Sequence, residues 1–227
     1  MAGARLLLWV LISVLSTLVL FGVSFAAFAF ARGDWVAFFQ SPARVGMVVV
    51  SLLLAVAAVF SGFGGGMSPG KKEDRGNRWI FGPFFVLSLA VAVVPPYLDG
   101  RDLWTTDAAV TPYVGLALLT LGGTLRLAAV FALGRRFTGL VAIQQEHHLQ
   151  TGGLYRHIRH PSYAGMLLYM AGYVLVFRCW LGLLLVAGTL AVLLARMSAE
   201  EALLESEFGE EYALYRRRTW RLVPWVY

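Results

Sequence analysis

The sequence predicts an all-α fold, a polytopic transmembrane bundle of five to six helices in which the last two form a hairpin, followed by a C-terminal amphipathic helix. Of its 227 residues, 59% are hydrophobic and only 14% are charged, whereas soluble domains have about 45–50% and about 25%. Several uncharged runs reach the roughly 20 residues that cross a bilayer. These runs are continuous rather than alternating, which favours helices over a β-barrel.

Four long apolar runs predict membrane-spanning helices at residues 6–30, 45–63, 79–97 and about 109–133. The third run is expected to stop at Pro95-Pro96, and the fourth contains one charge, Arg126. Two shorter runs, 163–177 and 180–195, are separated by Arg178 and Cys179 and predict a tight helical hairpin. Six helices are expected, or five if the hairpin does not cross fully. We divide the chain into N-terminal transmembrane helices (1–108) and a C-terminal domain (109–227) that carries the chemistry.

Basic residues gather in segments that alternate along the chain. They precede the first run, lie between the second and third and between the fourth and fifth, and follow the last, including Arg216, Arg217 and Arg218. The positive-inside rule then predicts that both termini are cytoplasmic. The net charge of +6 is read as this topology signal together with attraction to membrane lipids. Two lysines against seventeen arginines suggest a GC-rich genome and hence a bacterial inner membrane.

Several other functions are disfavoured by the sequence. No basic, aromatic-interleaved soluble segment indicates nucleic-acid binding. The first apolar run is longer than a typical signal-peptide core, so we expect it to be retained. The glycine-rich stretch 62–70 lacks the Gly-Lys-Ser/Thr ending of a phosphate-binding loop. The single cysteine, Cys179, excludes an intramolecular disulfide and a cysteine metal cluster, and we expect it at a turn. No metal ligands are predicted.

Residues that can carry chemistry are concentrated between Arg126 and Pro224. Pro161 followed by Ser162 is typical of a helix start, and the free N–H groups there suit a ligand carboxylate. Arg196 and Glu200 are four residues apart and therefore share one face where the last helix leaves the membrane. A cation and an anion at that place could bind the opposite charges of a zwitterionic ligand.

Two motifs in this region resemble the isoprenylcysteine carboxyl methyltransferase and phospholipid methyltransferase superfamily. The first is Gly153-Leu154-Tyr155-Arg156 followed by Arg159-His160-Pro161-Ser162-Tyr163-Ala164-Gly165. The second is Glu200-Glu201 followed by Phe208-Gly209-Glu210-Glu211-Tyr212. The likeness covers roughly the last hundred residues and includes Gly123 to Arg126. Their order and separation make the resemblance specific.

The resemblance implies an integral membrane enzyme that transfers a methyl group from S-adenosylmethionine to a lipophilic small molecule or lipid. It assigns Arg196 and Glu200 as catalytic residues, with Arg196 orienting the acceptor and Glu200 contacting the cofactor. The residues it implies for the cofactor pocket are Gln144, His147, His148, Leu149, Gln150, Tyr155, His160, Pro161, Ser162, Tyr163, Glu200 and Glu201. His148, Gln150 and the pair Gly152-Gly153 depart from the family's usual residues, which weakens the adenosine-side assignment.

Alternative interpretations stay open at this stage. His160 could only bond the linker, Arg196 and Glu200 could form an exposed helix pair of about 0.3–0.5 kcal/mol, and Arg126 could snorkel to the interface instead of facing the substrate pocket. Two other functions compete with methyl transfer. One is an NADPH-dependent membrane reductase of the sterol type, which usually has Asn where this chain has Ser162. The other is a non-catalytic lipid-binding protein. The methyl acceptor, whether carboxylate, amine or hydroxyl, is not specified.

Overall fold

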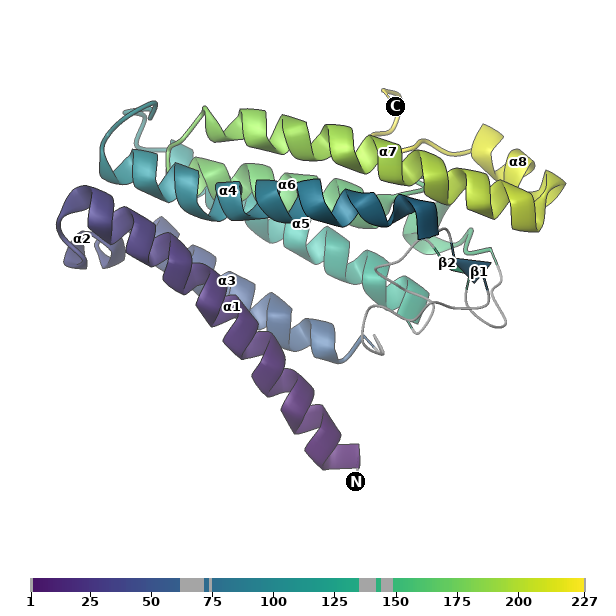
Figure 1. Cartoon of the computed structure of the whole chain (residues 1–227), viewed down its shortest axis with the longest axis horizontal. Coiled ribbons are helices and arrows are strands. Elements are labelled where there is room, and N and C mark those ends of the chain that lie inside the picture. Colours follow the sequence, from purple (N-terminus) through teal and green to yellow (C-terminus); the bar gives the residue numbers. More distant parts are fainter. Residues whose placement is uncertain (1, 62–71, 74, 135–141, 144–148, 227) are drawn as a thin grey trace.

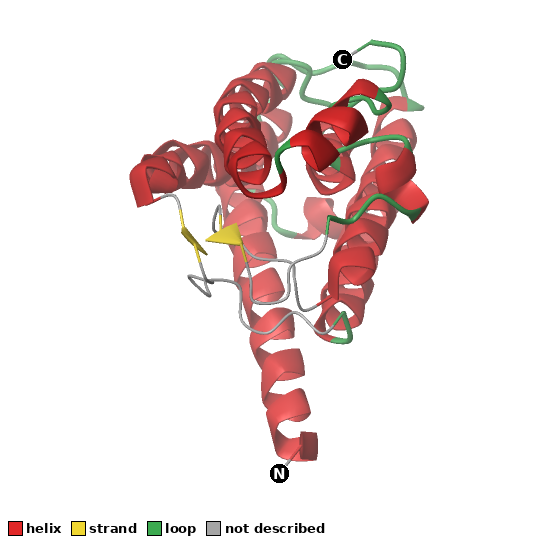
Figure 2. Ribbon diagram, turned by 90° about the vertical axis from the view of Figure 1, so that its right-hand side faces the viewer, coloured by secondary structure: helices red, strands yellow, loops and turns green. Residues whose placement is uncertain are grey.

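The computed structural model describes residues 2–61, 72–73, 75–134, 142–143 and 149–226 and consists of packed helices (Figure 1). The helices are α1 (Ala2–Arg32), α2 (Val36–Phe39), α3 (Pro42–Val59), α4 (Phe81–Gly100), α5 (Thr111–Leu133), α6 (Pro161–Val176), α7 (Gly182–Phe208) and α8 (Glu210–Arg217), with short 3₁₀ helices η1 (Arg75–Ile80) and η3 (Gly153–Arg156). Strands β1 (Lys72–Glu73) and β2 (Ala142–Ile143) pair antiparallel, and Figure 2 shows this small sheet beside the helices.

Five helices among the described residues are long and apolar enough to cross a membrane. These five spans correspond to α1, α3, α4, α5 and α7. Helix α6 is a shorter apolar helix. This agrees with the predicted count of five to six and with a break after residue 177. The prediction of two short hairpin helices was wrong for the second one, because α7 continues without interruption for 27 residues to Phe208. Its polar last turns therefore extend the helix that carries Arg196 and Glu200.

The predicted end of the third helix at Tyr97 was also wrong. Helix α4 runs to Gly100 with Pro95 and Pro96 inside it. Proline cannot donate to the carbonyl four residues earlier, so Pro96 leaves the carbonyl of Ala92 without its helical donor. The hydroxyl of Tyr173 on α6 lies 3.5 Å from this oxygen and donates to it. A side chain from a neighbouring helix thus satisfies the freed carbonyl, as membrane helices require.

Helices α5 and α6 pack backbone against backbone through four glycines. A Cβ placed on Gly172 would lie 2.2 Å from the amide nitrogen of Leu119, and one on Gly122 would lie 2.3 Å from that of Tyr169. Gly115 and Gly165 meet α6 and α5 in the same way. In lipid, where helix association depends on close packing, small residues allow this approach. The contact fixes the register between Arg126 near the end of α5 and the first turn of α6.

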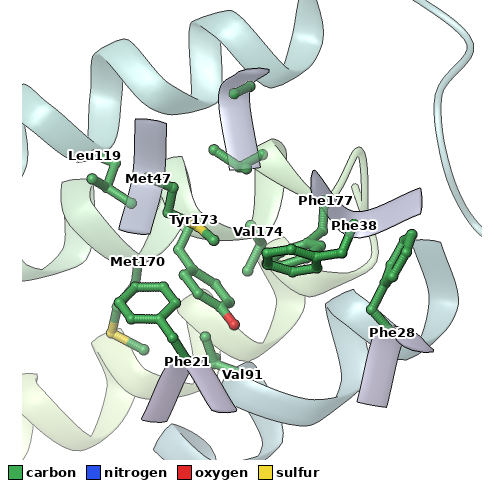
Figure 3. Packing of buried hydrophobic residues seen from close by; sticks show 12 residues of the cluster. Phe21, Phe28, Phe38, Met47, Val91, Leu119, Met170, Tyr173, Val174 and Phe177 are labelled. Atoms are coloured by element: carbon green, nitrogen blue, oxygen red, sulfur yellow. The ribbon is translucent and has the colours of Figure 1, made fainter. Parts of the chain in front are cut away.

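Aromatic and methionine side chains fill the middle of the bundle (Figure 3). Phe21 and Phe28 of α1 and Phe38 of α2 meet Tyr173 and Phe177 of α6 there, with ring centroids 5.2–6.4 Å apart. The hydroxyl of Tyr173 shares a 2.6 Å hydrogen bond with Ser24, so its polar end is paired inside the core. Outside this core, large apolar side chains of α1 and α4 stay exposed, as expected for helices that face lipid.

Candidate active site

Tyr163, in the first turn of α6, connects the two residues predicted to be catalytic. Its hydroxyl accepts a 2.6 Å hydrogen bond from Nε of Arg196 and donates one of 2.9 Å to Oε2 of Glu200. Arg196 is buried, with 8% of its surface exposed, and its guanidinium also lies over the rings of Phe81 and Tyr163. Arg196 and Glu200 therefore do not form the exposed helix pair that the sequence left open as an alternative. The three side chains form one polar group at the membrane exit of α7.

Glu201, the next residue, pairs with a different set of side chains. Its Oε1 accepts hydrogen bonds of 3.0 Å each from Nε of Arg159 and Nε2 of His160, and Nε of Arg221 is 3.2 Å away. The side chain is only 11% exposed. Buried carboxylates are stable in this form when several hydrogen bonds compensate their lost hydration. Glu201 thus joins α7 to the segment before α6 and to the C-terminal tail.

The C-terminal tail lies alongside the segment that precedes α6. Backbone amides of Arg159 and His160 donate to the carbonyls of Trp220 and Arg221, and the amide of Trp220 donates to His157. The side chain of Arg159 also donates to the carbonyl of Thr219. The imidazole of His160 stacks on the ring of Tyr163 at a centroid distance of 5.5 Å. His160 therefore holds a fixed position between the tail, Glu201 and Tyr163.

Tyr155, in η3, anchors the other side of this region. Its hydroxyl donates to the carbonyl of Ala129 on α5 at 3.4 Å, and its own carbonyl accepts a 2.7 Å bond from the hydroxyl of Tyr215 on α8. Burial raises the pKa of Tyr155, and the nearby negative charge of Glu200 raises it further. The phenol therefore stays neutral at physiological pH. Tyr155 closes the polar region on the side opposite α7.

The side chain of Arg126 faces the interior of the bundle and does not extend to the membrane interface, which was the alternative interpretation. Its Nη1 lies 3.3 Å from the hydroxyl oxygen and 3.4 Å from the carbonyl oxygen of Ser162 and donates to both. The glycine contact described above sets this position, since Gly122 precedes Arg126 by one turn and Gly165 packs on the amide of Arg126. The side chain of Arg126 therefore lies at the start of α6, against Ser162, the residue directly before Tyr163 in the chain.

An apolar cavity of about 400 Å³ opens beside Arg126 within the membrane-spanning part of the bundle. Its walls come from α1, α3, α4, α5 and α6, and include Leu54, Phe84, Met166 and Tyr173. Phe84 and Met166 also pack against the cluster that contains Met197, one residue after Arg196. The cavity therefore lies next to the apolar cluster around Met197, and Arg126 is the charged residue of its lining. Such a space accommodates an apolar chain whose polar head is held by arginine.

The structure brings together most of the residues that the sequence predicted. Tyr155, His160, Pro161, Ser162 and Tyr163 meet Arg196, Glu200 and Glu201 where α6 begins and α7 ends its membrane span. Leu149 and Gln150 are half-buried in the segment before η3. Three further predicted residues, Gln144, His147 and His148, lie outside the described residues. Cys179 is buried at the turn between α6 and α7, as expected.

Sequence reasoning missed two parts of the site. Arg221 and the tail carbonyls were not candidates, because a tail that pairs with residues about 60 positions earlier leaves no local pattern. The cavity was missed because its lining residues are ordinary apolar side chains on five separate helices. Arg159 could have been found, since it stands in the Arg-His-Pro motif. Its contacts with Glu201 and Thr219 give it a positioning role.

Comparisons with known proteins agree on one family. The family model described as "Isoprenylcysteine carboxyl methyltransferase (ICMT) family" matches residues 115–206. A probable protein-S-isoprenylcysteine O-methyltransferase of Oryza sativa subsp. indica is 37% identical over 168 residues, covering 69% of this chain and 84% of the rice protein. The protein-S-isoprenylcysteine O-methyltransferase of Mus musculus is 32% identical over 115 residues, covering 49% of this chain and 41% of the mouse protein.

One solved structure is also similar along nearly the whole chain. It is described as the eukaryotic intramembrane Ras methyltransferase ICMT (isoprenylcysteine carboxyl methyltransferase) without a monobody. Its sequence identity is 22% and its TM-score is 0.45, with 99% of this chain and 94% of that chain covered. A likeness at this level does not bear on the placement of individual residues.

Proposed function

Because the chain belongs to the isoprenylcysteine carboxyl methyltransferase family, we propose that it transfers a methyl group from S-adenosylmethionine to the carboxylate of a lipophilic acceptor, with an S-prenylated cysteine as the acceptor class. The observation that carries this proposal is the polar group Arg196–Tyr163–Glu200 next to an apolar cavity of about 400 Å³. Family membership supports a methyltransferase over the reductase and the non-catalytic alternatives.

The donor set around Tyr163 fits the cofactor. S-adenosylmethionine is zwitterionic at its amino-acid end, and it supplies a methyl group that is already activated for transfer. Glu200 would hold the ammonium group, because its Oε2 is engaged by Tyr163 while Oε1 has no bond to a described residue. Tyr155 and the start of α6 would line the remaining pocket, with His160 and Glu201 as positioning residues behind them. The predicted Leu149 and Gln150, half-buried in the segment before η3, would extend it.

In this reaction the residues of the protein mainly have to bind and orient the reactants. A carboxylate acceptor is already a nucleophile and needs no general base. Arginine binds carboxylates in a planar, charge-assisted geometry, so Arg196 would orient the acceptor, and Arg126 would balance its charge at the mouth of the cavity. The bond between Tyr163 and Arg196 limits the motion of the guanidinium. Orientation of this kind is the main source of rate acceleration in such transfers.

We also propose that the active-site end of the bundle faces the cytosol, with both termini on that side. The starts of α4 and α6 and the ends of α3, α5 and α7 lie at this end (Figure 1), and the basic segments of the sequence adjoin these positions. The relatives compared above come from a plant and a mammal, so they give no support to a bacterial inner membrane. The proposal is therefore confined to the orientation.

Titration with S-adenosylhomocysteine tests the cofactor assignment. Glu200→Gln should weaken its binding at least tenfold, because the neutral amide cannot pair with an ammonium group. The matched control is Glu205→Gln, one turn further along α7, where the carboxylate is 45% exposed and bonds only Arg216 on the surface. Unchanged affinity in the Glu200 variant, or stabilisation of the protein by NADPH alone, would overturn the proposal.

A second measurement tests the acceptor class. The protein in mixed micelles should transfer a labelled methyl group to an S-farnesylated, N-blocked cysteine but not to the corresponding amide, which lacks the carboxylate. Arg196→Lys should reduce kcat while it leaves the affinity for S-adenosylhomocysteine within about twofold, since lysine keeps the charge but loses the planar geometry. Equal transfer to the amide would contradict a carboxylate acceptor.

A further inference from the structure

The opposite end of the bundle contains a second group of buried charges, separate from the proposed active site. A polar cleft of about 240 Å³ lies there, and its lining includes Arg32, Ser41, Arg44, Asp99 and Arg178. These side chains come from the end of α1, the start of α3, the end of α4 and the turn between α6 and α7. In Figure 1 this is the left-hand end, away from α8.

Ion pairs connect these residues into one network. Asp99, fully buried in its side chain, accepts from Nη2 of Arg44 at 2.7 Å and from Nε of Arg178 at 2.6 Å. Asp102 accepts from Nη2 of Arg178 at 2.7 Å and also from Nη1 of Arg32. All four carboxylate oxygens are therefore occupied. Three arginines and two aspartates leave the network with a formal charge of +1.

The arginines retain donors that the carboxylates do not use. A guanidinium carries five N–H groups, yet within the described part of the chain Arg32 donates a single hydrogen bond, to Asp102, and its side chain is 46% exposed. Nε of Arg44 is buried and has no hydrogen-bond partner among the described residues. A buried donor without a partner is costly. A network whose acceptors are all occupied, and which has spare donors and a positive surplus, is suited to an additional anion.

The backbone also departs from its preferred conformation at this network. Arg178 and Asp102, which pair with each other, both have positive φ values, 54° and 51°. Arginine rarely adopts this left-handed conformation, and such strain persists only where surrounding contacts enforce it. The turn between α6 and α7 therefore places the Arg178 side chain against Asp99 and Asp102 at a conformational cost. A simple surface loop would not need this arrangement.

The surroundings of the cleft identify the kind of anion. Exposed tryptophans lie in the segments at this end of the bundle: Trp35 is 63% exposed, Trp104 55% and Trp180 47%, and the last two rings contact each other at 5.1 Å. Tryptophans of this kind mark the headgroup depth of a bilayer. The anion that is abundant at this depth is the phosphate of a lipid headgroup, which arginine binds with charge-assisted bonds.

We propose that this cleft binds the phosphate of an anionic phospholipid, through Arg32, Arg44 and Arg178. The remaining charges of this end lie outside the lining of the cleft. Asp34 accepts a bond from the amide of Val36, and Arg101 lies over the ring of Tyr97. The bound lipid stabilises the junction of α1, α3, α4 and the α6–α7 turn. This site does not depend on the proposed methyl transfer.

Native mass spectrometry of the full-length protein in detergent tests this proposal, with phosphatidylglycerol as the probe and phosphatidylcholine as the zwitterionic comparison. Arg32→Gln should weaken phosphatidylglycerol binding about five- to tenfold, the loss expected for one charged contact at the interface. Arg101→Gln, at the same end but outside the cleft, is the matched control and should retain the affinity. Equal weakening by both variants would overturn a specific site, because general surface charge would explain it.

A second variant is expected to bind phosphatidylglycerol more tightly than the wild type does. Asp102→Asn removes one negative charge and releases donors of Arg32 and Arg178, so the network reaches a formal charge of +2. Binding of phosphatidylglycerol should then tighten several-fold, although the variant loses two ion pairs. Weaker or unchanged binding in Asp102→Asn would overturn the proposal, since a purely structural network gains nothing from the loss of a carboxylate.

Inorganic phosphate distinguishes the two sources of the ligand. Millimolar phosphate should raise the melting temperature of the protein far less than phosphatidylglycerol does, because the lipid also contributes its acyl chains. If phosphate alone protects the wild type as strongly as the lipid does, and Arg32→Gln abolishes this protection, the site binds a free anion and the lipid assignment is wrong.

Discussion

At each end of the bundle, a carboxylate from one helix pairs with side chains on other segments of the chain. Asp99 of α4 joins Arg44 of α3 to Arg178 of the α6–α7 turn. Glu201 of α7 joins Arg159 and His160, before α6, to Arg221 of the tail. Both carboxylates hold the helices in register. The difference lies in what stands next to them.

The proposed active-site end has a second polar group in addition to Glu201 and its partners. Glu200, adjacent to Glu201, belongs to the chain Arg196–Tyr163–Glu200 beside an apolar cavity. At the far end, the carboxylates of Asp99 and Asp102 are fully engaged and leave only arginine donors. Comparison of the two ends teaches that a buried ion network by itself is weak evidence for either stability or function, and that binding or chemistry requires groups with unfilled positions beside it.

The largest expected effect comes from the glycine contact that holds both ends in place. Gly122→Ala combined with Gly172→Ala should cost about 4 kcal/mol or more in unfolding free energy, because each new Cβ overlaps backbone atoms of the opposite helix. Thermal unfolding in detergent measures this loss, which should affect binding at both ends.

The control for this pair is Gly22→Ala combined with Gly188→Ala. A Cβ on Gly22 meets nothing within 4 Å, and one on Gly188 makes an ordinary 3.4 Å contact with Leu87. Alanine favours the helix over glycine, so this control should be neutral or slightly stabilising. Similar losses in both pairs would show that the close contact between α5 and α6 is not what holds the two ends.

A smaller loss of stability is expected for variants of the two carboxylates, Asp99 and Glu201, which should differ in their effect on cofactor binding. Asp99→Asn and Glu201→Gln should each destabilise the protein by about 3 kcal/mol, because each leaves arginines partly buried without their charge partner. Only Glu201→Gln should also weaken S-adenosylhomocysteine binding, by at least tenfold, since it releases His160 and Arg159. Calorimetric titration of both variants checks this. Loss of cofactor affinity in Asp99→Asn would contradict the separation of the two ends.

The smallest expected effect on stability belongs to Tyr163→Phe. It removes one hydroxyl and its two hydrogen bonds to charged groups, which corresponds to about 2 kcal/mol. The rate of methyl transfer should nevertheless fall about tenfold, because Arg196 and Glu200 lose the group that holds them together. Tyr97→Phe at the far end is the control and should change neither quantity. An unchanged rate in Tyr163→Phe would remove the positioning role of the tyrosine.

The sequence by itself determined the membrane-spanning class, the approximate positions of the helices and the main candidates for chemistry. Composition and run length are sufficient for the first two, because the bilayer imposes one structural solution on long uncharged segments. The motif around His160 and the pair Glu200–Glu201 supplied the candidate site residues, and four-residue spacing on a helix predicted that Arg196 and Glu200 share one face.

Only the tertiary structure decided what each of these residues contacts. The sequence could not distinguish Glu200, which bonds Tyr163, from Glu201, which pairs with Arg159, His160 and Arg221, because one helical position separates them. It also stopped α4 too early at Pro95-Pro96, where Tyr173 of another helix satisfies the freed carbonyl. The direction of Arg126, the tail beside His160 and the Asp99 network depend in the same way on partners 30 to 80 residues distant. Local patterns carry no information about such contacts, which arise only when the helices pack.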